Sequence, residues 1–373
     1  MRILHVATLD SPDGAFGGPT RVAHTQCAEL ARQGHVVDLA VGSPREGVGQ
    51  FDGGGYGILR FRARKLAPVG GFASLVSWPM LRWLRDNVKN YDAIHVHLAR
   101  DLVTLPAASI AQAADIPVFA QTHGMVDPSK RMSARVVDLL ATRRVLRHSR
   151  VVFALTAAEE VDLAGVEPAV KVRRVVNGVA IPDRQPVRVV RESGTREVLF
   201  LARLHERKRP VAFVEMAAIV SRQLSDVQFT IAGPDEGELA AVSDTISRLA
   251  LEDRVRVVGP LAPESTDAAM ARADVFVLPS TGEVFPMTVL EAFRVGTPAV
   301  VTDSLGIADE CRRAGAAVVT DGSASALASA VSELLGDATA AKRQAEAAYH
   351  LLHSTMTIRS AVSPILEAYG EAE

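Results

Sequence analysis

The chain is poor in cysteine and in long apolar runs, and each shortage excludes a class of protein. Two cysteines, Cys27 and Cys311, among 373 residues cannot form a disulfide framework, so we expect a reducing, cytoplasmic setting. No uninterrupted apolar stretch reaches the roughly 18 residues needed to span a bilayer. The opening "MRILHVATLD" has one basic residue and a short apolar run, which predicts a β-strand rather than a signal peptide.

What remains is the composition of a globular α/β protein, with 23% charged and 48% hydrophobic residues and no low-complexity tract. The length suits two domains of roughly 150 to 200 residues each. The net charge of −2 conceals an asymmetry, because residues 1–180 carry 22 Lys/Arg against 16 Asp/Glu and the remainder carries 19 against 27. A basic first half would face an acidic ligand or an anionic membrane surface, and we expect no nucleic-acid partner.

Short β-branched runs alternate with helical patterns through the first half. The predicted strands cover residues 2–9, 35–41, 92–98, 117–122, 151–155 and 172–176. The predicted helices cover residues 19–33, 74–88, 102–113 and 130–148. Because the strands are continuously apolar rather than alternating, they favour buried parallel sheets.

The pattern restarts after a segment rich in proline, glycine and charge near Pro182. Predicted strands then cover residues 197–203, 227–233, 254–259, 274–280, 297–303 and 316–321. The sequence therefore predicts two doubly wound, Rossmann-like parallel-sheet domains facing across a cleft, with ligands at the carboxyl ends of the strands. The predicted parts are one domain at 1–181, a second domain at 182–350 and a helical segment at 351–373 packed back on the first domain.

Two strand ends in the first half carry candidate ligand-binding residues. Gly17 and Gly18 lie in the loop between the first strand and a helix predicted to open with Pro19 and Thr20, where backbone N–H groups can meet phosphate, although an ordinary strand-to-helix turn is the alternative. The G-x-G-x-x-G dinucleotide spacing is not present. His123 ends another strand and could donate to a phosphate or a sugar hydroxyl. His95 and His97 lie inside a strand, and for them we expect packing roles.

The second half offers basic and acidic strand-end loops. Arg203 follows a strand and Lys208 precedes a helix, where they could clamp a diphosphate, although a solvated surface is the alternative. Three acids in "GPDEGEL", at positions 235, 236 and 238, have no accompanying histidine or matching carboxylate set, so we predict no metal site there. Gly259 lies in a further strand-end loop.

The segment "STGEVFPMTVLEAFRVGTPAV" holds Glu283 and Glu291, eight residues apart. A strand ends before it and Gly296 ends the helix inside it, which places Glu283 in a loop and Glu291 about one turn into the helix. The N–H groups of Met287 and Thr288 at the helix start would donate hydrogen bonds to an anion. The alternative is that both acids are surface charges.

The order of these motifs resembles the retaining glycosyltransferases of family 4, which have the GT-B fold. The resemblance spans nearly the whole chain and rests on "GGPT", "THGM", "VNGV", "ARLHERK", "IAGPDEGE" and, above all, the E-x7-E motif followed by "EAFRVGTPAVV".

This resemblance implies roles for individual residues. Glu291 would hold the ribose of a nucleotide sugar and Glu283 the hydroxyls of the transferred sugar, while Arg203 and Lys208 would bind the diphosphate. His123 would lie near the donor phosphate and the sugar's outer hydroxyl. The remaining donor-binding positions implied are Gly17, Gly18, Gly259, Phe285, Met287 and Thr288. The family uses no metal or other cofactor, and its donors are nucleotide-diphosphate sugars, most often of UDP or GDP.

The chain departs from the family at Val284 and Pro286, where many relatives have glycines beside the phenylalanine. Since Pro286 lacks an N–H, fewer backbone donors would reach the phosphate. "HGMVDPSKRM" resembles enzymes of bacterial exopolysaccharide and cell-surface glycan assembly, which implies a hydroxyl acceptor. A small natural-product acceptor, a sugar-nucleotide epimerase and a non-catalytic nucleotide-sugar binder are the alternatives. The loops from Val48 to Gly71 and around Asp127 would set the acceptor.

The segment 129–150 carries seven Lys/Arg against one Asp, with apolar residues near helical spacing. It could rest on the anionic inner face of a membrane and bring a lipid-linked acceptor to the enzyme. The alternative is an amphipathic helix that packs on its own sheet and exposes a basic face to solvent.

Overall fold

The computed structural model describes residues 1–10, 17–43, 48–66, 71–181 and 194–371. They form two compact units, one of residues Met1–Gly178 with Ile358–Glu373, the other of Val179–Thr357. The linker expected around Pro182 lies largely outside the described residues. Among the described residues, no helix is both long and apolar enough to cross a membrane.

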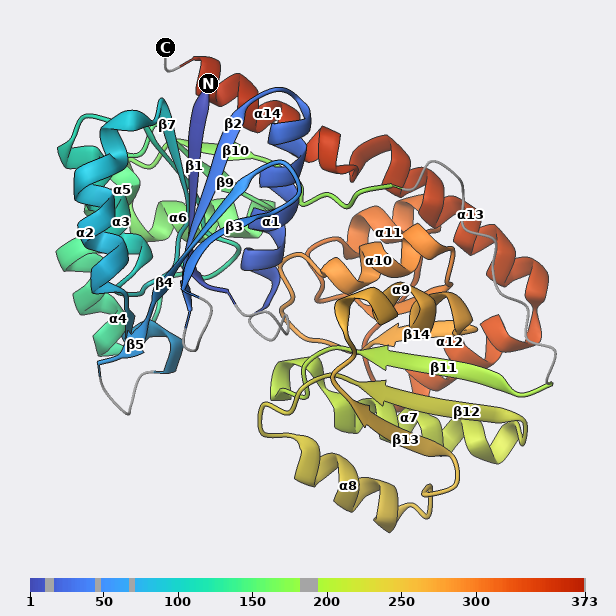
Figure 1. Ribbon diagram of the computed structural model, residues 1–373. Coiled ribbons are helices and arrows are strands. Elements are labelled where there is room, and N and C mark those ends of the chain that lie inside the picture. The colour runs from blue at the N-terminus through green and yellow to red at the C-terminus, as the bar shows by residue number, and fades with distance from the viewer. Residues whose placement is uncertain (11–16, 44–47, 67–70, 182–193, 372–373) are drawn as a thin grey trace. The chain divides into compact units, whose positions relative to one another are not determined.

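The first unit is built on an eight-stranded sheet in the order β10-β9-β8-β7-β1-β2-β4-β3 (Figure 1). Its strands are β1 (Arg2–Leu9), β2 (Val36–Ser43), β3 (Gly49–Asp52), β4 (Gly57–Arg62), β7 (Ala93–His97), β8 (Val118–Gln121), β9 (Val151–Ala154) and β10 (Val172–Arg174). A two-stranded sheet pairs β5 (Arg64–Lys65) with β6 (Leu75–Val76). Every pairing in the large sheet is parallel except β3 with β4, so the predicted buried parallel sheet is confirmed.

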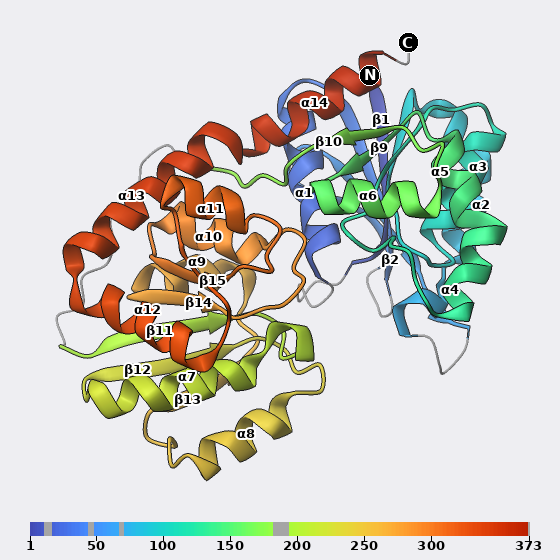
Figure 2. The ribbon, with the colours of Figure 1, turned by 180° about the vertical axis from the view of Figure 1, so that it is seen from behind.

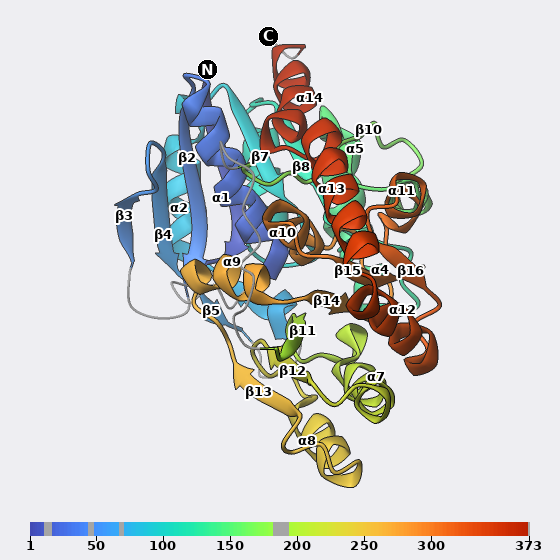
Figure 3. The same ribbon diagram turned by 90° about the vertical axis from the view of Figure 1, so that its right-hand side faces the viewer.

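Two sets of helices cover the faces of this sheet. The helices are α1 (Gly17–Arg32), α2 (Trp78–Asn87), α3 (Thr104–Ala113), α4 (Met132–Val137), α5 (Arg143–His148), α6 (Ala157–Val166) and α14 (Ile358–Gly370), with short helical turns η1 (Gly71–Ser74) and η2 (Val88–Asn90) and a π-helical turn η3 (Asp138–Thr142). One core joins α2, α3, α5 and α6 to side chains such as Leu4, Val6, Ile94 and Val96. On the other face α1 lies beside α14 (Figures 1 and 3).

Three predictions for the first unit are wrong in detail. The helix expected from Ser74 begins only at Trp78, because η1 and β6 precede it. The helix expected over 130–148 begins at Met132 and is interrupted by η3. The acceptor loops expected from Val48 to Gly71 contain the edge hairpin β3–β4, whose first strand is wholly exposed.

The second unit has a six-stranded parallel sheet in the order β13-β12-β11-β14-β15-β16. Its strands are β11 (Arg196–Leu201), β12 (Val227–Ala232), β13 (Val255–Gly259), β14 (Val275–Leu278), β15 (Ala299–Thr302) and β16 (Val318–Thr320). Its helices are η4 (Glu206–Lys208), α7 (Pro210–Gln223), α8 (Leu239–Arg248), α9 (Pro263–Arg272), α10 (Met287–Val295), α11 (Ala308–Ala314), α12 (Ala324–Gly336) and α13 (Ala338–Thr355). Helices α7 and α12 pack together on one side, and α10 contacts α9 and α13 (Figure 2).

The strand order of the second unit reverses between β11 and β14. From β11 the chain steps outward to β12 and β13, then returns to β14 and steps the other way to β15 and β16. At such a switch point the loops after the two central strands diverge and leave room for a ligand at the carboxyl edge of the sheet. The loops that follow β11 and β14 are those of "ARLHERK" and of the E-x7-E motif.

Candidate active site

The E-x7-E motif has the local structure that its sequence predicts. Helix α10 runs from Met287 to Val295 and ends at Gly296, whose φ of 75° is the left-handed conformation that glycine adopts without strain. Glu283 lies in the loop and is half-buried, whereas Glu291 lies in the helix and is only 1% exposed. The interpretation of Glu291 as a solvated surface charge is therefore wrong.

The start of α10 leaves backbone donors available for an anion. Pro286 is its N-cap residue, and no side chain in the described part of the chain caps the helix there. The N–H of Val289 bonds to the Pro286 carbonyl at 3.1 Å, and the two preceding helical residues, Met287 and Thr288, provide the first N–H groups of the helix. Phe285, just before them, is 8% exposed and packs inward.

Lys208 and Glu283 form an ion pair that joins the two loops at the switch point. The side chains of the pair are 14% and 17% exposed, and the ammonium Nζ donates to Oε2 of the carboxylate. Burial lowers the pKa of Lys208, and the carboxylate of Glu283 opposes that shift. Both residues were predicted site residues, and the structure brings them together.

Two hydrogen bonds to backbone carbonyls join the loops that carry this ion pair. The N–H of Thr281 donates to the Arg207 carbonyl at 2.8 Å, and the Arg207 guanidinium donates to the Gly282 carbonyl at 2.9 Å. Arg209, which precedes α7, has a φ of 53°, an uncommon conformation for a residue with a side chain. Arg209 directly follows Lys208, so this uncommon backbone conformation lies between the Lys208–Glu283 ion pair and the start of α7.

Arg203 and the neighbouring acidic loop form a second polar group at the same edge. The Arg203 guanidinium donates to both oxygens of Glu236 at 2.8 Å and is 44% exposed. Asp235 accepts hydrogen bonds from the N–H groups of Gly237 and Leu239, so this acid caps its own loop. Gly259 ends β13, and its carbonyl accepts from the N–H of Gly233 at 2.9 Å.

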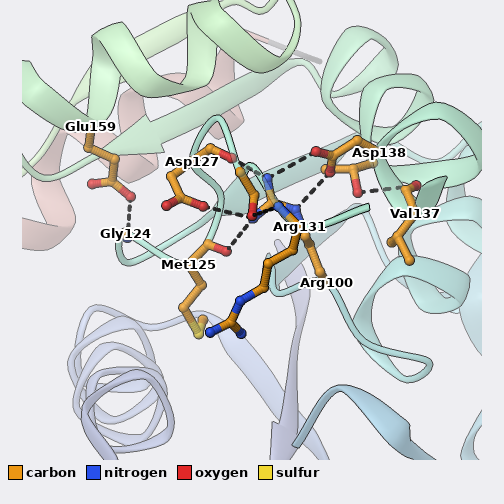
Figure 4. Close-up of polar contacts among 10 residues, drawn as sticks. Arg100, Gly124, Met125, Asp127, Arg131, Val137, Asp138 and Glu159 are labelled. Atoms are coloured by element: carbon orange, nitrogen blue, oxygen red, sulfur yellow. Dashed lines mark hydrogen bonds and ion pairs between the residues drawn. The ribbon is translucent and has the colours of Figure 1, made fainter. Parts of the chain in front are cut away.

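His123 occupies the corresponding edge of the first unit, directly after β8. Its φ is 52° and that of Gly124 is 73°. The buried carboxylate of Glu159 accepts from the Gly124 N–H at 2.6 Å (Figure 4). It also accepts from the Thr122 hydroxyl at 2.5 Å, so it fixes the residues on both sides of His123. Burial lowers the pKa of His123 to about 3, which keeps the imidazole neutral at pH 7.

Arg100 anchors the chain that follows His123. Its guanidinium donates to Asp138 at 2.7 and 3.1 Å, to the Met125 carbonyl at 3.2 Å, to the Asp127 carboxylate at 3.0 Å and to the Asp127 carbonyl (Figure 4). One buried cation therefore ties the His123 loop to η3. The predicted acceptor loop around Asp127 is therefore anchored by Arg100, a residue of the same unit.

Gly17 and Gly18 are the first residues of α1, which begins two residues before the predicted start at Pro19. The Thr20 hydroxyl donates to the Leu9 carbonyl at 2.7 Å, which ties this start to the end of β1. Apart from Gly18's own helix and chain neighbours, no atom of the described residues lies within 4 Å of where a Cβ on Gly18 would stand. The loop between β1 and α1, residues 11–16, lies outside the described residues.

Two family models together cover most of the chain. Residues 17–178 match the glycosyl transferase 4-like domain, and residues 183–351 match the glycosyl transferases group 1. The chain belongs to the family 4 glycosyltransferases. Its two doubly wound units are those of the GT-B fold, as the resemblance implied.

Relatives of this glycosyltransferase act on different molecules. It is 25% identical to a 2-deoxystreptamine N-acetyl-D-glucosaminyltransferase of Niallia circulans, over 66% of this chain and 68% of the relative. It is 26% identical to a D-inositol 3-phosphate glycosyltransferase of Corynebacterium glutamicum, over 90% and 87%. In fold it is similar to Anabaena HepE in complex with UDP and glucose, with a TM-score of 0.77, 17% identity and 99% of each chain covered.

Sequence reasoning about this glycosyltransferase missed Glu159, Arg100 and the partner of Lys208. Glu159 is the one that a local signal could have revealed, because "TAAE" is a capping box in which the Thr156 hydroxyl accepts from the Glu159 N–H at 3.1 Å. Arg100 and the Lys208–Glu283 pair carry no such signal, since their partners are tens of residues away in the sequence.

Proposed function

We propose that this glycosyltransferase moves a hexose from a nucleotide-diphosphate sugar to a hydroxyl acceptor with retention of anomeric configuration. The observation that carries the proposal is the Lys208–Glu283 pair at the switch point, with the buried Glu291 one turn into α10. It combines a cation for diphosphate, a carboxylate for sugar hydroxyls and a second carboxylate for ribose. UDP or GDP is the proposed nucleotide, and HepE, a protein of similar fold, binds UDP and UDP-glucose.

The proposed reaction needs no metal, because the chain supplies the positive charge itself. Lys208, Arg203 and the N-terminal amides of α10 would stabilise the diphosphate as its bond to the sugar C1 breaks. A C1–O bond to the acceptor forms on the same face, and the acceptor's proton passes to a diphosphate oxygen. His123 would donate a hydrogen bond to the phosphate or to the sugar's outer hydroxyl. Pro286, which has no N–H, removes one donor that glycine would supply there.

A thermal-shift screen with UDP, GDP, ADP and TDP sugars tests the donor, because a ligand that binds the folded state raises its apparent stability. With the donor known, NMR of the product's anomeric proton distinguishes retention from inversion. A transferase hydrolyses its donor slowly alone and much faster with an acceptor. An epimerase would release nucleotide without any acceptor, and a binder would not turn over. Acceptor-dependent turnover that survives Glu283→Ala would contradict the role given to Glu283.

We propose further that the acceptor lies on a membrane and that α4 with η3 contacts an anionic bilayer on the cytoplasmic side. Four apolar side chains on this segment, Met132, Val136, Leu139 and Leu140, are 69%, 49%, 70% and 74% exposed. Basic residues flank them at positions 130, 131, 135, 143 and 144. An exposed apolar stripe within a basic segment is the pattern of interfacial helices, while Val137, Ala141 and the buried Leu146 of the same segment pack on the core of the unit.

Sedimentation with anionic liposomes at low salt measures this contact. Replacing Leu139 and Leu140 with serine should weaken partitioning at least about tenfold, since each leucine would bury its side chain in the interface. Val161→Ser is the matched control, because Val161 is 71% exposed on a different helix, α6. A wild-type protein that stays in the supernatant, or a double variant that still sediments fully, would contradict the membrane contact.

A further inference from the structure

A row of buried histidines runs inward from His123. His5 on β1 and His95 on β7 are register partners, and His97 lies two residues further along β7 on the same face. All three are at most 1% exposed. Their face of the sheet is the one covered by α1 and α14, opposite the apolar core of the unit.

Hydrogen bonds link three of these rings in series. Nδ1 of His5 lies 3.2 Å from Nε2 of His97, and Nδ1 of His97 lies 2.8 Å from Nε2 of His123. His95 stands apart from this series, because its Nδ1 is 2.6 Å from the Tyr369 hydroxyl on α14. The side chain of His123 is thus bound through His97 to His5.

The cluster does not have the geometry of a metal centre. His5, His95 and His97 each place a nitrogen within 4.8 Å of the others. However, the rings of His5 and His95 are stacked, with centroids 4.6 Å apart and planes only 4° from parallel. A ligating imidazole directs its lone pair within the ring plane, so two parallel stacked rings cannot both point at one ion about 2 Å away.

Neutral imidazoles make the series directional. Burial lowers the pKa of His5 to about 3 and that of His97 well below its usual value, with the neighbouring histidines adding to the effect on His97. A neutral ring has one N–H donor and one acceptor nitrogen. His97 uses both of its nitrogens within the series, so it donates in one of its two hydrogen bonds and accepts in the other. The His5–His97 and His97–His123 bonds therefore run in the same direction.

The inner end of the series decides that direction. Nε2 of His5 is buried and has no hydrogen-bond partner among the described residues. If the bonds ran inward from His123, this nitrogen would carry an N–H with nothing to receive it, which is the costlier and rarer kind of orphaned group. If the hydrogen bonds run outward from His5, Nε2 of His5 carries no hydrogen and leaves only a lone pair without a partner. The favoured order is therefore His5 to His97 to His123.

We infer that His97, supported by His5, is a positioning residue that holds His123 as the tautomer protonated on Nδ1. His123 then presents an N–H, rather than a lone pair, at the nitrogen not bonded to His97. Glu159 fixes the backbone on both sides of this residue, so both the ring and the peptide are set before a ligand binds. The identity of the group that receives this N–H, an oxygen of the diphosphate or of the transferred sugar, rests on the proposed function.

Long-range ¹H–¹⁵N spectra of histidine-labelled wild-type protein at pH 7 test the tautomer without any donor sugar. His123→Gln assigns the resonances by their loss. We expect His123 with a protonated Nδ1 and a bare Nε2. A protonated Nε2, or a doubly protonated ring, would overturn the inference whatever reaction the protein catalyses.

Substitutions at His97 test the positioning role. His97→Asn keeps an N–H donor near the position of Nδ1, whereas His97→Leu removes it. We expect His97→Leu to lower kcat/KM about tenfold, the worth of one lost hydrogen bond to a reacting group, and to leave His123 as a mixture of tautomers, while His97→Asn restores most of both.

The control is His95→Leu, a change on the same strand and face whose hydrogen-bond partner is Tyr369. It should lower stability but leave the His123 tautomer and kcat/KM close to wild type. Equal effects from His95→Leu and His97→Leu on the tautomer would reduce His97 to a packing residue and refute the inference. A wild-type protein that turns over no nucleotide sugar but shows the Nδ1 tautomer would refute the proposed function instead.

Discussion

The Lys208–Glu283 pair predicts that removing a carboxylate tightens nucleotide binding. Two unit charges about 4 Å apart at an effective dielectric of about 20 attract by about 4 kcal/mol. Side chains that are only 14% and 17% exposed retain part of this attraction, and a net coupling of about 1 to 2 kcal/mol is reasonable for such a pair. A diphosphate that binds Lys208 must compete with Glu283 for the same ammonium.

Glu283→Gln removes this competitor for the Lys208 ammonium. We therefore expect it to bind UDP roughly fivefold more tightly, equivalent to about 1 kcal/mol, while turnover falls because the sugar hydroxyls lose their charged partner. Lys208→Met should weaken UDP binding about 10- to 100-fold, since a charge-assisted hydrogen bond is lost.

Isothermal titration calorimetry with UDP on wild type, both single variants and the double variant measures the coupling directly. The double variant should bind UDP as Lys208→Met does, because the effect of Glu283 acts through Lys208. If the screen identifies another nucleotide, that nucleoside diphosphate replaces UDP. The reasoning is refuted if Glu283→Gln weakens binding, or if the two substitutions are additive.

Three further predictions concern stability, each measured by urea unfolding. Gly233→Ala should lower the free energy of unfolding by more than about 3 kcal/mol, because the φ of Gly233 is 147° and a Cβ there would stand 1.9 Å from the Ala202 carbonyl oxygen. A loss below about 1 kcal/mol would mean that the ends of β11 and β12 can move apart to make room. Arg100→Met should lower the free energy of unfolding by about 3 to 5 kcal/mol, because it leaves the buried Asp138 carboxylate without its cation. The control is the same change at an exposed arginine. His5 and His123 each have a pKa of about 3 in the fold against 6.5 in the unfolded chain. Lowering the pH from 7.5 to 5 should therefore cost about 2 kcal/mol of stability for each of them, because only the unfolded chain takes up the protons. Equal stability at the two pH values would contradict the conclusion that both imidazoles are neutral in the fold.

The sequence was most informative where a buried strand is bounded by turn residues. The first strand was predicted as Arg2–Leu9 and β1 has those bounds, because a continuous apolar run between charged residues has few other conformations available. The hairpin β3–β4 was missed because it is an exposed edge whose turn is a glycine run, so it lacks the apolar pattern of a buried strand.

The places of the candidate site residues in the fold were predictable from the sequence, but the contacts among them were not. Arg203, Lys208, Glu283 and Glu291 all lie in loops or helices that follow strands, as expected. That Lys208 would pair with Glu283, and Arg203 with Glu236, depends on which strands are neighbours in the sheet, and strand order is not written in local composition. The role of His97 was also hidden, since a histidine inside a strand usually packs.

The chain leaves its first unit at Gly178 and returns to it only at Ile358, after the whole second unit. Tyr369, on the returning helix α14, is fully buried and its hydroxyl reaches His95 beneath the sheet face that α1 shares. During synthesis the part of this face that α14 covers therefore stays open while about 180 residues of the second unit are translated and folded. The first unit to emerge from the ribosome is the last to be completed, and a chain cut short before Tyr369 would leave His95 without its hydroxyl partner and without the cover of α14.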